Sequence, residues 1–449
     1  MVNNQINRRC FLRHAAGTAM AFSYIPRHVM GGKGHIAPSE KLNIAGIGVG
    51  GMGACNLQAL KEENIVAMCD VDHNYAANIF KRYPQAKIYR DYRKMLDEKK
   101  EIDAVVIATP DHTHAVISMA AIRAKKHVYC QKPLTHDVYE ARMLTQAAKE
   151  AGVITQMGIQ GHSMEGIRLI REWIEAGLIG SVRQVDAWCN LSYYPFGHAG
   201  WSSKWSRHPQ GKSPVPDKLD WDLWLGPAAE RPYHLAYHPR TWRCWWDYGC
   251  GMMGDRGVHT FDPIVWSLKL GMPSSVDANS LDLNSDTHPI ASIVEFDFPR
   301  RGVLPPVKVT WYDGLQPPRP RELDKGRRLG DGEGGIIFKG DNGLIMCGTY
   351  GQEPRLLPVS RMRETKSIKK SLPRIDGFHE HDWVRCCKLN TQPGANFTYS
   401  GPLTETVLLG NVAKRVNARL EWDAQALKVT NHTDANQYIR RPYREGWSL

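Results

Sequence analysis

Short apolar runs alternate with segments of helical periodicity in the first third of the chain. The predicted strands cover residues 42–47, 65–69, 104–108, 127–130 and 153–157. The predicted helices cover residues 54–60, 115–124 and 137–151. Strands that alternate with helices in this way predict a parallel, doubly wound sheet, which binds ligands at the carboxyl ends of its strands.

The first predicted strand leads directly into the pattern Gly48-x-Gly50-x-x-Gly53. In such a turn the first glycine permits tight bending, the second lets the backbone approach a pyrophosphate, and the third lets helix pack on strand. The second predicted strand ends at Asp70, where an acid would bind the ribose of NAD and repel the 2′-phosphate of NADP. Asp72 competes for this role, and a loop cap is the alternative for Asp70. We therefore expect a Rossmann domain that binds NAD, with NADP less favoured.

The pattern changes to isolated strands in the last third of the chain. Residues 292–298, 306–311, 335–340 and 344–348 have strand character, and residues 312–334 are rich in Pro, Arg and Gly. We divide the chain into a leader and linker (1–35), a Rossmann domain (36–158) and a C-terminal α+β domain (159–449) with a large, mostly antiparallel sheet.

An aromatic-rich insertion is expected over residues 190–250. The chain has 14 tryptophans, and half of them lie between Trp201 and Trp246. Their flat apolar faces with polar edges suit sugar rings, although a loop core would also use such residues. The predicted substrate contacts are Trp245, Trp246, Arg240, Arg243 and Arg256.

Composition excludes several classes of protein. The net charge is +12 over 449 residues, but the basic residues are scattered and no nucleic-acid motif accompanies them. No apolar stretch approaches the roughly 18 residues that a membrane helix needs. His112 with His114, and His379 with His381, do not supply a metal-ligand set, so we expect no metal. A disulfide between Cys244 and Cys250 is conceivable in an oxidising compartment.

The N-terminus carries a pattern typical of export. Arg8-Arg9, one spacer and Phe11-Leu12 resemble a twin-arginine signal, and a mildly apolar stretch follows over residues 15–25. The alternative is a disordered basic N-terminus. Twin-arginine export moves folded proteins, so we expect a periplasmic enzyme that carries its cofactor with it and releases it slowly.

Two further segments carry a family resemblance. Ala108-Thr109-Pro110 with His114, and Gln131-Lys132-Pro133, both follow predicted strands. Together with the glycine turn and the pair Asp255 and His259, they resemble the family named after glucose–fructose oxidoreductase, inositol dehydrogenase and a rhizopine-catabolism protein (Gfo/Idh/MocA), and within it an exported bacterial subgroup. The family has Glu where this chain has Gln131, which puts in question how Lys132 is held.

The resemblance implies a set of residue roles. Thr109, Pro110, His114 and Lys132 would contact the cofactor, and Lys132, Asp255 and His259 would be catalytic. An ammonium at Lys132 would stabilise a developing alkoxide, and His259 would act as general base. Asp255 would orient one of them, with a helix N-cap as its alternative role. At a spacing of four residues, Asp255 and His259 would share one helix face.

The leading functional hypothesis is an NAD-dependent oxidoreductase that acts on a secondary hydroxyl of a sugar or glycoside, with oxidation of glucosides at carbon 3 as the preferred case. A glycosidase that oxidises its substrate transiently is the runner-up. A non-catalytic NAD- or sugar-binding protein is the third hypothesis. The resemblance also implies a homo-oligomer.

Overall fold

The computed structural model describes residues 40–449 except 195, 196 and 199. The predicted export signal lies outside the described residues. Within them, no helix is both long and apolar enough to span a membrane.

A six-stranded parallel sheet forms the first domain, in the order β3-β2-β1-β4-β5-β6. Its strands are β1 (Asn43–Ile47), β2 (Asn64–Cys69), β3 (Lys87–Tyr89), β4 (Ala104–Ile107), β5 (His127–Cys130) and β6 (Thr155–Met157). Its helices are α3 (Met52–Ala59), α4 (Ala77–Arg82), α5 (Tyr92–Glu98), α6 (His114–Arg123) and α7 (Val138–Ala151). The central strands β1 and β4 are almost wholly apolar and buried, which is why helices cover both faces of the sheet.

A nine-stranded sheet forms the second domain, in the order β13-β12-β11-β7-β10-β9-β8-β14-β15. The pair β7 and β10 is parallel and the other pairs are antiparallel. Its longer strands are β7 (Val182–Cys189), β8 (Ser275–Leu281), β9 (Ala291–Phe298), β10 (Val307–Asp313), β11 (Gly334–Gly340) and β12 (Gly343–Cys347). The short edge strands are β13 (Arg355–Leu357), β14 (Leu420–Asp423) and β15 (Lys428–Val429).

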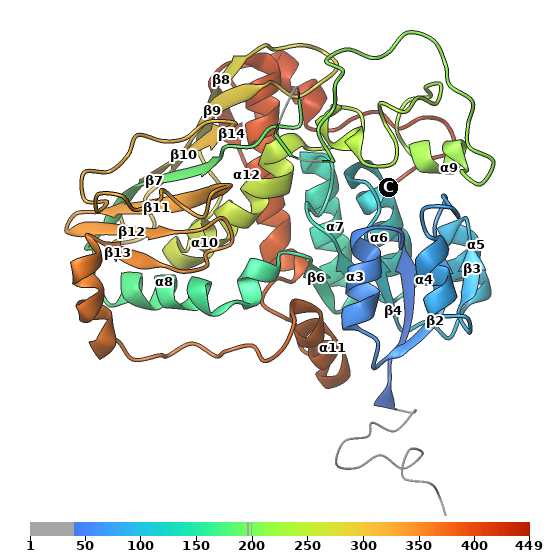
Figure 1. The fold of residues 1–449 in the computed structure, drawn as a ribbon, viewed down its shortest axis with the longest axis horizontal. Coiled ribbons are helices and arrows are strands. Elements are labelled where there is room, and N and C mark those ends of the chain that lie inside the picture. The colour runs from blue at the N-terminus through green and yellow to red at the C-terminus, as the bar shows by residue number, and fades with distance from the viewer. Residues whose placement is uncertain (1–39, 195–196, 199) are drawn as a thin grey trace, which may run out of the picture.

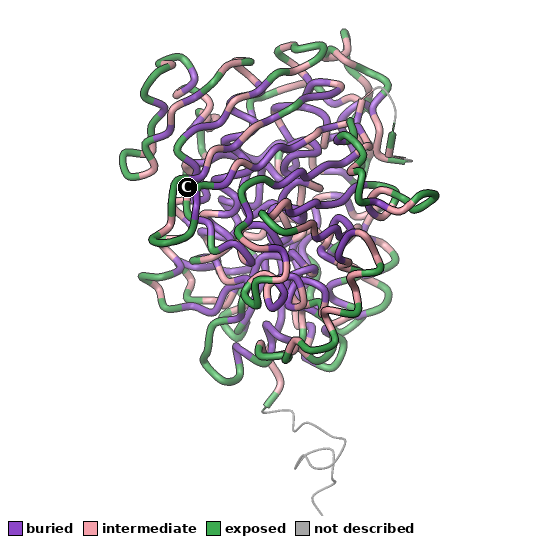
Figure 2. The backbone as a smooth tube through the Cα atoms, turned by 90° about the vertical axis from the view of Figure 1, so that its left-hand side faces the viewer, coloured by how far each residue is buried: buried purple, intermediate pink, exposed green. Residues whose placement is uncertain are grey.

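Helices join the two sheets into one body. The helices outside the first domain are α8 (Glu165–Glu175), α9 (Trp221–Leu225), α10 (Val258–Leu268), α11 (His379–Leu389) and α12 (Phe397–Val416). Helix α12 packs on both α7 and β8, so it lies between the domains (Figure 1). One cluster of buried apolar side chains includes members of both sheets, and buried backbone continues through the centre of the molecule (Figure 2).

The structure confirms the predicted fold class, and it also shows what the pattern missed. Strand β3 was not predicted because only three residues form it and two of them are exposed. The longest helix, α12, contains Pro402 and is buried around most of its circumference, so it lacks an amphipathic stripe. Cys244 and Cys250 are free thiols, so the conceivable disulfide is absent.

Candidate active site

The glycine turn lies between β1 and α3, at the carboxyl edge of the parallel sheet. Gly48 has φ +76°, and a Cβ atom there would lie 2.7 Å from the Thr109 backbone nitrogen. A Cβ on Gly53 would collide with the carbonyl oxygen of Gly48. The turn therefore needs glycine at both positions, and it brings the first amides of α3 to the mouth of a cavity, as a pyrophosphate requires.

Asp70 lies beside this turn, directly after β2. Its Oδ2 accepts hydrogen bonds from the backbone nitrogens of Val49 (2.9 Å) and Gly50 (3.0 Å). Burial raises the pKa of Asp70 to about 6. The competing acid, Asp72, instead caps the next turn by accepting from the backbone nitrogens of Asn74 and Tyr75. Of these two acids, Asp70 lines the cavity and Asp72 does not, which favours Asp70 as the ribose-binding acid.

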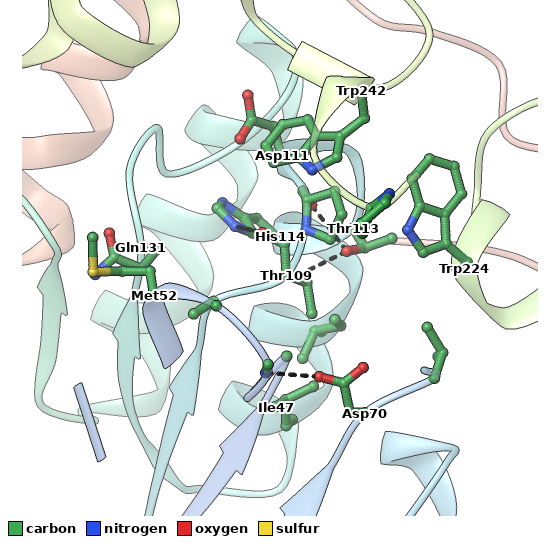
Figure 3. Close-up of a pocket in the computed structure, with 18 of the residues that line it drawn as sticks. Ile47, Met52, Asp70, Thr109, Asp111, Thr113, His114, Gln131, Trp224 and Trp242 are labelled. Atoms are coloured by element: carbon green, nitrogen blue, oxygen red, sulfur yellow. Dashed lines mark hydrogen bonds between the residues drawn. The ribbon is translucent and has the colours of Figure 1, made fainter. Parts of the chain in front are cut away.

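The cavity has a volume of about 540 Å³ and runs along the carboxyl edge of the sheet (Figure 3). This size is within the range of small-molecule and cofactor sites. Asp70 follows β2 and Lys132 follows β5, which are separated by β1 and β4, so the cavity extends from Asp70, Tyr92 and Trp224 at one end to Lys132 and Asp255 at the other. Residues predicted to contact the cofactor also line it, namely Gly48, Gly50, Thr109, Pro110 and His114. A dinucleotide fits this arrangement, with its adenosine toward Asp70 and its nicotinamide toward Lys132.

His114 ties together two strand ends that line the cavity. Its Nδ1 lies 2.7 Å from the carbonyl oxygen of Pro133, and its Nε2 lies 2.8 Å from that of Thr109. Two carbonyl partners require both ring nitrogens to donate. Burial disfavours the charged ring, but Cys130, Asp111 and the Pro133 carbonyl outweigh this and raise the pKa of His114 to about 9. A charged His114 thus fixes the segment that carries Lys132 relative to Thr109.

Lys132, Asp255 and Tyr193 form a buried hydrogen-bonded group at one end of the cavity, hereafter the catalytic end. The Lys132 ammonium pairs with Oδ1 of Asp255, while the Tyr193 hydroxyl donates to Oδ2 of the same carboxylate. Both Asp255 and Tyr193 are about 95% buried or more. Sequence reasoning did not single out Tyr193, because only the fold brings the start of the insertion to Asp255.

Opposing interactions act on the pKa of Lys132. Burial and the nearby guanidinium groups of Arg243 and Arg256 lower its pKa to about 7. The carboxylates of Asp111 and Asp255 act in the opposite direction. Asp111, which was not singled out from the sequence, also lines the cavity and accepts a hydrogen bond from the backbone nitrogen of Cys250. A lysine with this pKa can exchange charge with a reacting hydroxyl near neutral pH.

Asp255 and His259 do not share a regular helix face as predicted. Residues Met253–Gly257 form a π-helical turn, and α10 begins only at Val258. The wider turn changes the angle between positions four apart, and the glycines 254 and 257 lower the cost of departing from α-helical geometry. His259 is buried, does not line the cavity, lies with its ring tilted against that of Tyr350, and has an Nδ1 without a partner among the described residues. Burial and the charge of Lys132 hold its pKa well below the usual value, so the ring is neutral.

The structure shows how Lys132 is held although Gln131 replaces the glutamate of the family. Its Nε2 donates to Oδ1 of Asn56 at 3.1 Å, and the Asn56 amide donates to Glu380 at 2.6 Å. Gln131 therefore joins the Lys132 segment to α3 through a neutral amide contact. Lys132 itself is held by Asp255.

The predicted substrate contacts need correction. Trp245 is fully buried and donates through Nε1 to the carbonyl of Ala236, whereas the ring of Trp246 lies tilted against that of His288; neither lines the cavity. Arg256 is turned toward Glu333, to which it is bonded at 2.8 Å. Trp245 belongs to the buried core, whereas Trp246 packs against Arg415 of α12 and lines a second cavity.

Other insertion residues reach the cavity instead. Arg240 lines it as predicted, together with Trp201, Trp242 and Arg243. The Arg243 guanidinium lies 4.4 Å from the ring centroid of Trp201 and 4.1 Å from that of Trp242. This stack of arginine and tryptophan forms a rigid wall with hydrogen-bond donors at its edge. Among the residues the structure describes, no group of three or more His, Cys, Asp or Glu side chains could hold a metal ion.

Two family models match the chain and together span more than half of it. One, described as an oxidoreductase family with an NAD-binding Rossmann fold, matches residues 42–159. The other, described as the C-terminal alpha/beta domain of the oxidoreductase family, matches residues 165–297. Both carry the name GFO_IDH_MocA.

Individual relatives match mainly the first domain. A myo-inositol 2-dehydrogenase of Thermotoga maritima is 26% identical over 141 residues, which are 31% of this chain and 42% of that protein. A levoglucosan dehydrogenase of Pseudarthrobacter phenanthrenivorans is 28% identical over 156 residues, 32% of this chain and 39% of that protein. The matches thus cover less than half the length of these relatives.

A solved structure extends the likeness of the fold to both domains. The WlbA dehydrogenase from Bordetella pertussis, in complex with NADH and UDP-GlcNAcA, aligns with a TM-score of 0.59 and 17% identity. The alignment covers 85% of this chain and 99% of that one.

Proposed function

Because the chain belongs to the Gfo/Idh/MocA oxidoreductase family, we propose that it oxidises a secondary hydroxyl of a sugar or glycoside to a ketone, or catalyses the reverse reaction. The observation that carries the proposal is the buried group of Lys132, Asp255 and Tyr193 at the catalytic end of a cavity that begins at a dinucleotide-binding turn. Relatives named as inositol and levoglucosan dehydrogenases support a polyol or sugar as substrate.

Each residue at the catalytic end has a chemical role in this proposal. NAD, when bound along the cavity, would supply the acceptor for the hydride that leaves the substrate carbon. The Lys132 ammonium donates a hydrogen bond to the reacting oxygen and stabilises negative charge as it develops. The neutral His259 does not line the cavity, and its Nδ1 has no partner among the described residues, so it would take up the hydroxyl proton through a bridging water. Asp255 holds Lys132 in place, and Tyr193 holds Asp255.

The wall of the insertion supplies the substrate contacts. Trp242 presents an apolar face, while Arg240 and Arg243 present donors for sugar hydroxyls or for an acidic substituent. A pyranose ring suits this combination of a flat apolar surface and several donors. Glucosides, with carbon 3 as the position of oxidation, are the first substrates to test.

One experiment tests the proposed reaction. Purified protein would be incubated with a panel of sugars and glycosides, with and without added NAD, and the products identified by mass spectrometry. A keto-sugar formed with equimolar NADH supports the proposal. Turnover of no member of the panel in either direction would refute it.

The second candidate is the glycosidase that uses NAD transiently. Its specific support is the Tyr193 hydroxyl, a second proton-transfer group beside Lys132 and Asp255. Burial raises the pKa of Tyr193, so its hydroxyl holds its proton at neutral pH and would donate it only to a strongly basic leaving group. The same panel separates the two candidates, because a glycosidase releases free aglycone without accumulating NADH.

We also propose that the enzyme is exported in its folded state, on the basis of Arg8, Arg9 and the apolar stretch that follows. Replacing both arginines with lysine should retain the precursor in the cytoplasm. Export that continues unchanged would contradict this proposal.

A further inference from the structure

The last eleven residues, 439–449, return from the second domain across the first; we call them the closing segment. The carbonyl of Ile439 accepts from the backbone nitrogen of Tyr139 at 3.0 Å. The Arg441 guanidinium and the Tyr443 hydroxyl both bond to Glu140 of α7, at 3.0 and 2.6 Å. The closing segment is therefore fixed to the Rossmann domain where it begins.

Arg444 then joins the closing segment to the insertion. Its Nη1 lies 2.6 Å from the Asp222 carboxylate, and its Nε donates to the carbonyl of Gly226 at 2.6 Å. Its backbone nitrogen donates to the carbonyl of Pro227 at 3.2 Å. These three bonds connect Arg444 to both the start and the end of α9. Figure 1 shows the C-terminal end of the chain beside α6 and α9.

The insertion is itself attached to the loop that follows β2. The backbone nitrogen of Asp220 donates to the carbonyl of Val71 at 2.9 Å, and that of His73 donates to Lys218 at 3.1 Å. The Arg90 guanidinium also donates to the Lys218 carbonyl, at 3.0 Å. As a result, α9 is held directly over the end of the cavity that contains Asp70.

Trp447 completes this enclosure. It lines the cavity together with Leu223 and Trp224 of α9, and the Arg93 guanidinium lies 4.9 Å from its ring centroid. Arg93 follows Tyr92, which lines the same end of the cavity. Since Asp70 marks the ribose of the adenosine, these aromatic side chains surround the position of the adenine. We call this the adenosine end.

We propose that the closing segment is part of the dinucleotide site: Trp447 covers the adenine, and Arg444 locks Trp447 and α9 together over it. The inference rests on the proposed use of the cavity for NAD. A cofactor enclosed from this side leaves only after the segment or α9 has moved, so its release is slow. The sequence led us to expect slow release, and an insertion that covers the nicotinamide side would contribute to it. The structure places two covers at the opposite end as well.

The test measures cofactor release without any sugar. Protein loaded with NADH would be mixed with excess NAD, and the loss of bound NADH fluorescence would give the dissociation rate. Trp447→Ala and Arg444→Ala should each release NADH ~10-fold faster than wild type, since changes at a binding site act mainly on dissociation. Matched controls are Trp205→Ala and Arg183→Ala, whose side chains do not line the cavity; Arg183 pairs with Asp341 in the second domain. These controls should release NADH at the wild-type rate.

Two further measurements protect the test against a variant that fails to fold. Asp222→Asn removes the negative charge that pairs with Arg444. The Asp222 side chain is 72% exposed, so the substitution leaves the core intact, and it should also speed release. Hydrogen exchange on wild type should slow at residues 439–449 and 218–226 when NADH binds. Release rates within twofold of wild type in all three variants, or exchange that slows only at the glycine turn, would overturn the proposal. Sugar turnover plays no part in these measurements, so they can succeed where the proposed reaction fails.

Discussion

The two ends of the cavity differ in what surrounds the ligand. At the catalytic end, charged side chains are buried against one another: Lys132 contacts Asp255, and the guanidinium of Arg243 lies close enough to lower the pKa of Lys132. At the adenosine end, aromatic rings and backbone amides line the cavity. The ion pair of Arg444 with Asp222 lies outside the cavity and joins the closing segment to α9. Preorganised buried charge acts on a transition state, whereas aromatic contact acts on a bound ground state. Substitutions at the two ends should therefore separate turnover from cofactor release.

The largest effect is expected for Lys132→Met. Loss of the ammonium removes the main stabiliser of the developing alkoxide, so kcat should fall ~10²–10³-fold. NADH affinity should stay within about threefold, because the adenosine end supplies most of the contacts. Stopped-flow absorbance and fluorescence titration measure the two quantities, and Lys149→Met, on the exposed face of α7, is the control. Activity within threefold of wild type would show that Lys132 is structural.

The wall of the insertion should affect substrate affinity. Arg243→Ala removes the cation between Trp201 and Trp242, and KM should rise ~10-fold with a smaller change in kcat. Arg243→Lys retains the charge but not the planar stack, so it should recover only part of the affinity. Steady-state kinetics with the best substrate of the panel would check this. An unchanged KM in both variants would remove the wall from the substrate site.

The pH dependence should report the ionisation of Lys132. Since its pKa is lowered to about 7, kcat/KM for oxidation should fall as pH rises past this value and the ammonium is lost. Tyr193→Phe frees Asp255 to attract the ammonium more strongly, so the decline should shift to higher pH by roughly half a unit, with kcat reduced about fivefold. Tyr194→Phe should leave the profile in place. A rate that rises through pH 7 would instead identify neutral Lys132 as the base.

The smallest effect concerns the choice of cofactor. With a pKa of about 6, Asp70 is charged at pH 8 and mostly protonated at pH 5. Its repulsion of the 2′-phosphate is lost on protonation, so the ratio of the Kd for NADP to that for NAD should fall roughly threefold or more between these pH values. In Asp70→Asn the ratio should be low throughout. A ratio that does not change with pH in the wild type would assign cofactor choice to another residue.

The difference between the ends also explains what could be predicted from the sequence. The glycine turn, Asp70 and Lys132 follow strands within a few residues, so local patterns identify their positions at the edge of the sheet. Trp447 reaches the cavity, and Tyr193 reaches Asp255, only through the packing of distant segments, and no local pattern marks them. The π-helical turn before α10 breaks the periodicity on which the pairing of Asp255 with His259 was based.

The tryptophans show a different limit. Composition alone could indicate that the insertion contributes aromatic side chains to a site, but it could not distinguish Trp242 from Trp245. Both side chains are buried, but only Trp242 lines the cavity. The hydrogen bond from Trp245 Nε1 to Ala236 satisfies its only donor inside that core. Which of two nearby tryptophans lines the cavity depends on tertiary contacts, and the local sequence does not reveal these contacts.

The central proposal is that the carbon bearing a secondary hydroxyl of a sugar or glycoside gives up a hydride to NAD at the catalytic end, while its hydroxyl loses a proton next to Lys132. The most direct measurement is a single turnover: wild type and Lys132→Met, loaded with equal NAD, are mixed with the glycoside panel while absorbance at the NADH band is followed. We predict that at least one substrate generates NADH and its keto-sugar in the wild type, and that the variant forms neither at a comparable rate. Equal NADH formation in both proteins, or none with any substrate, would contradict the account.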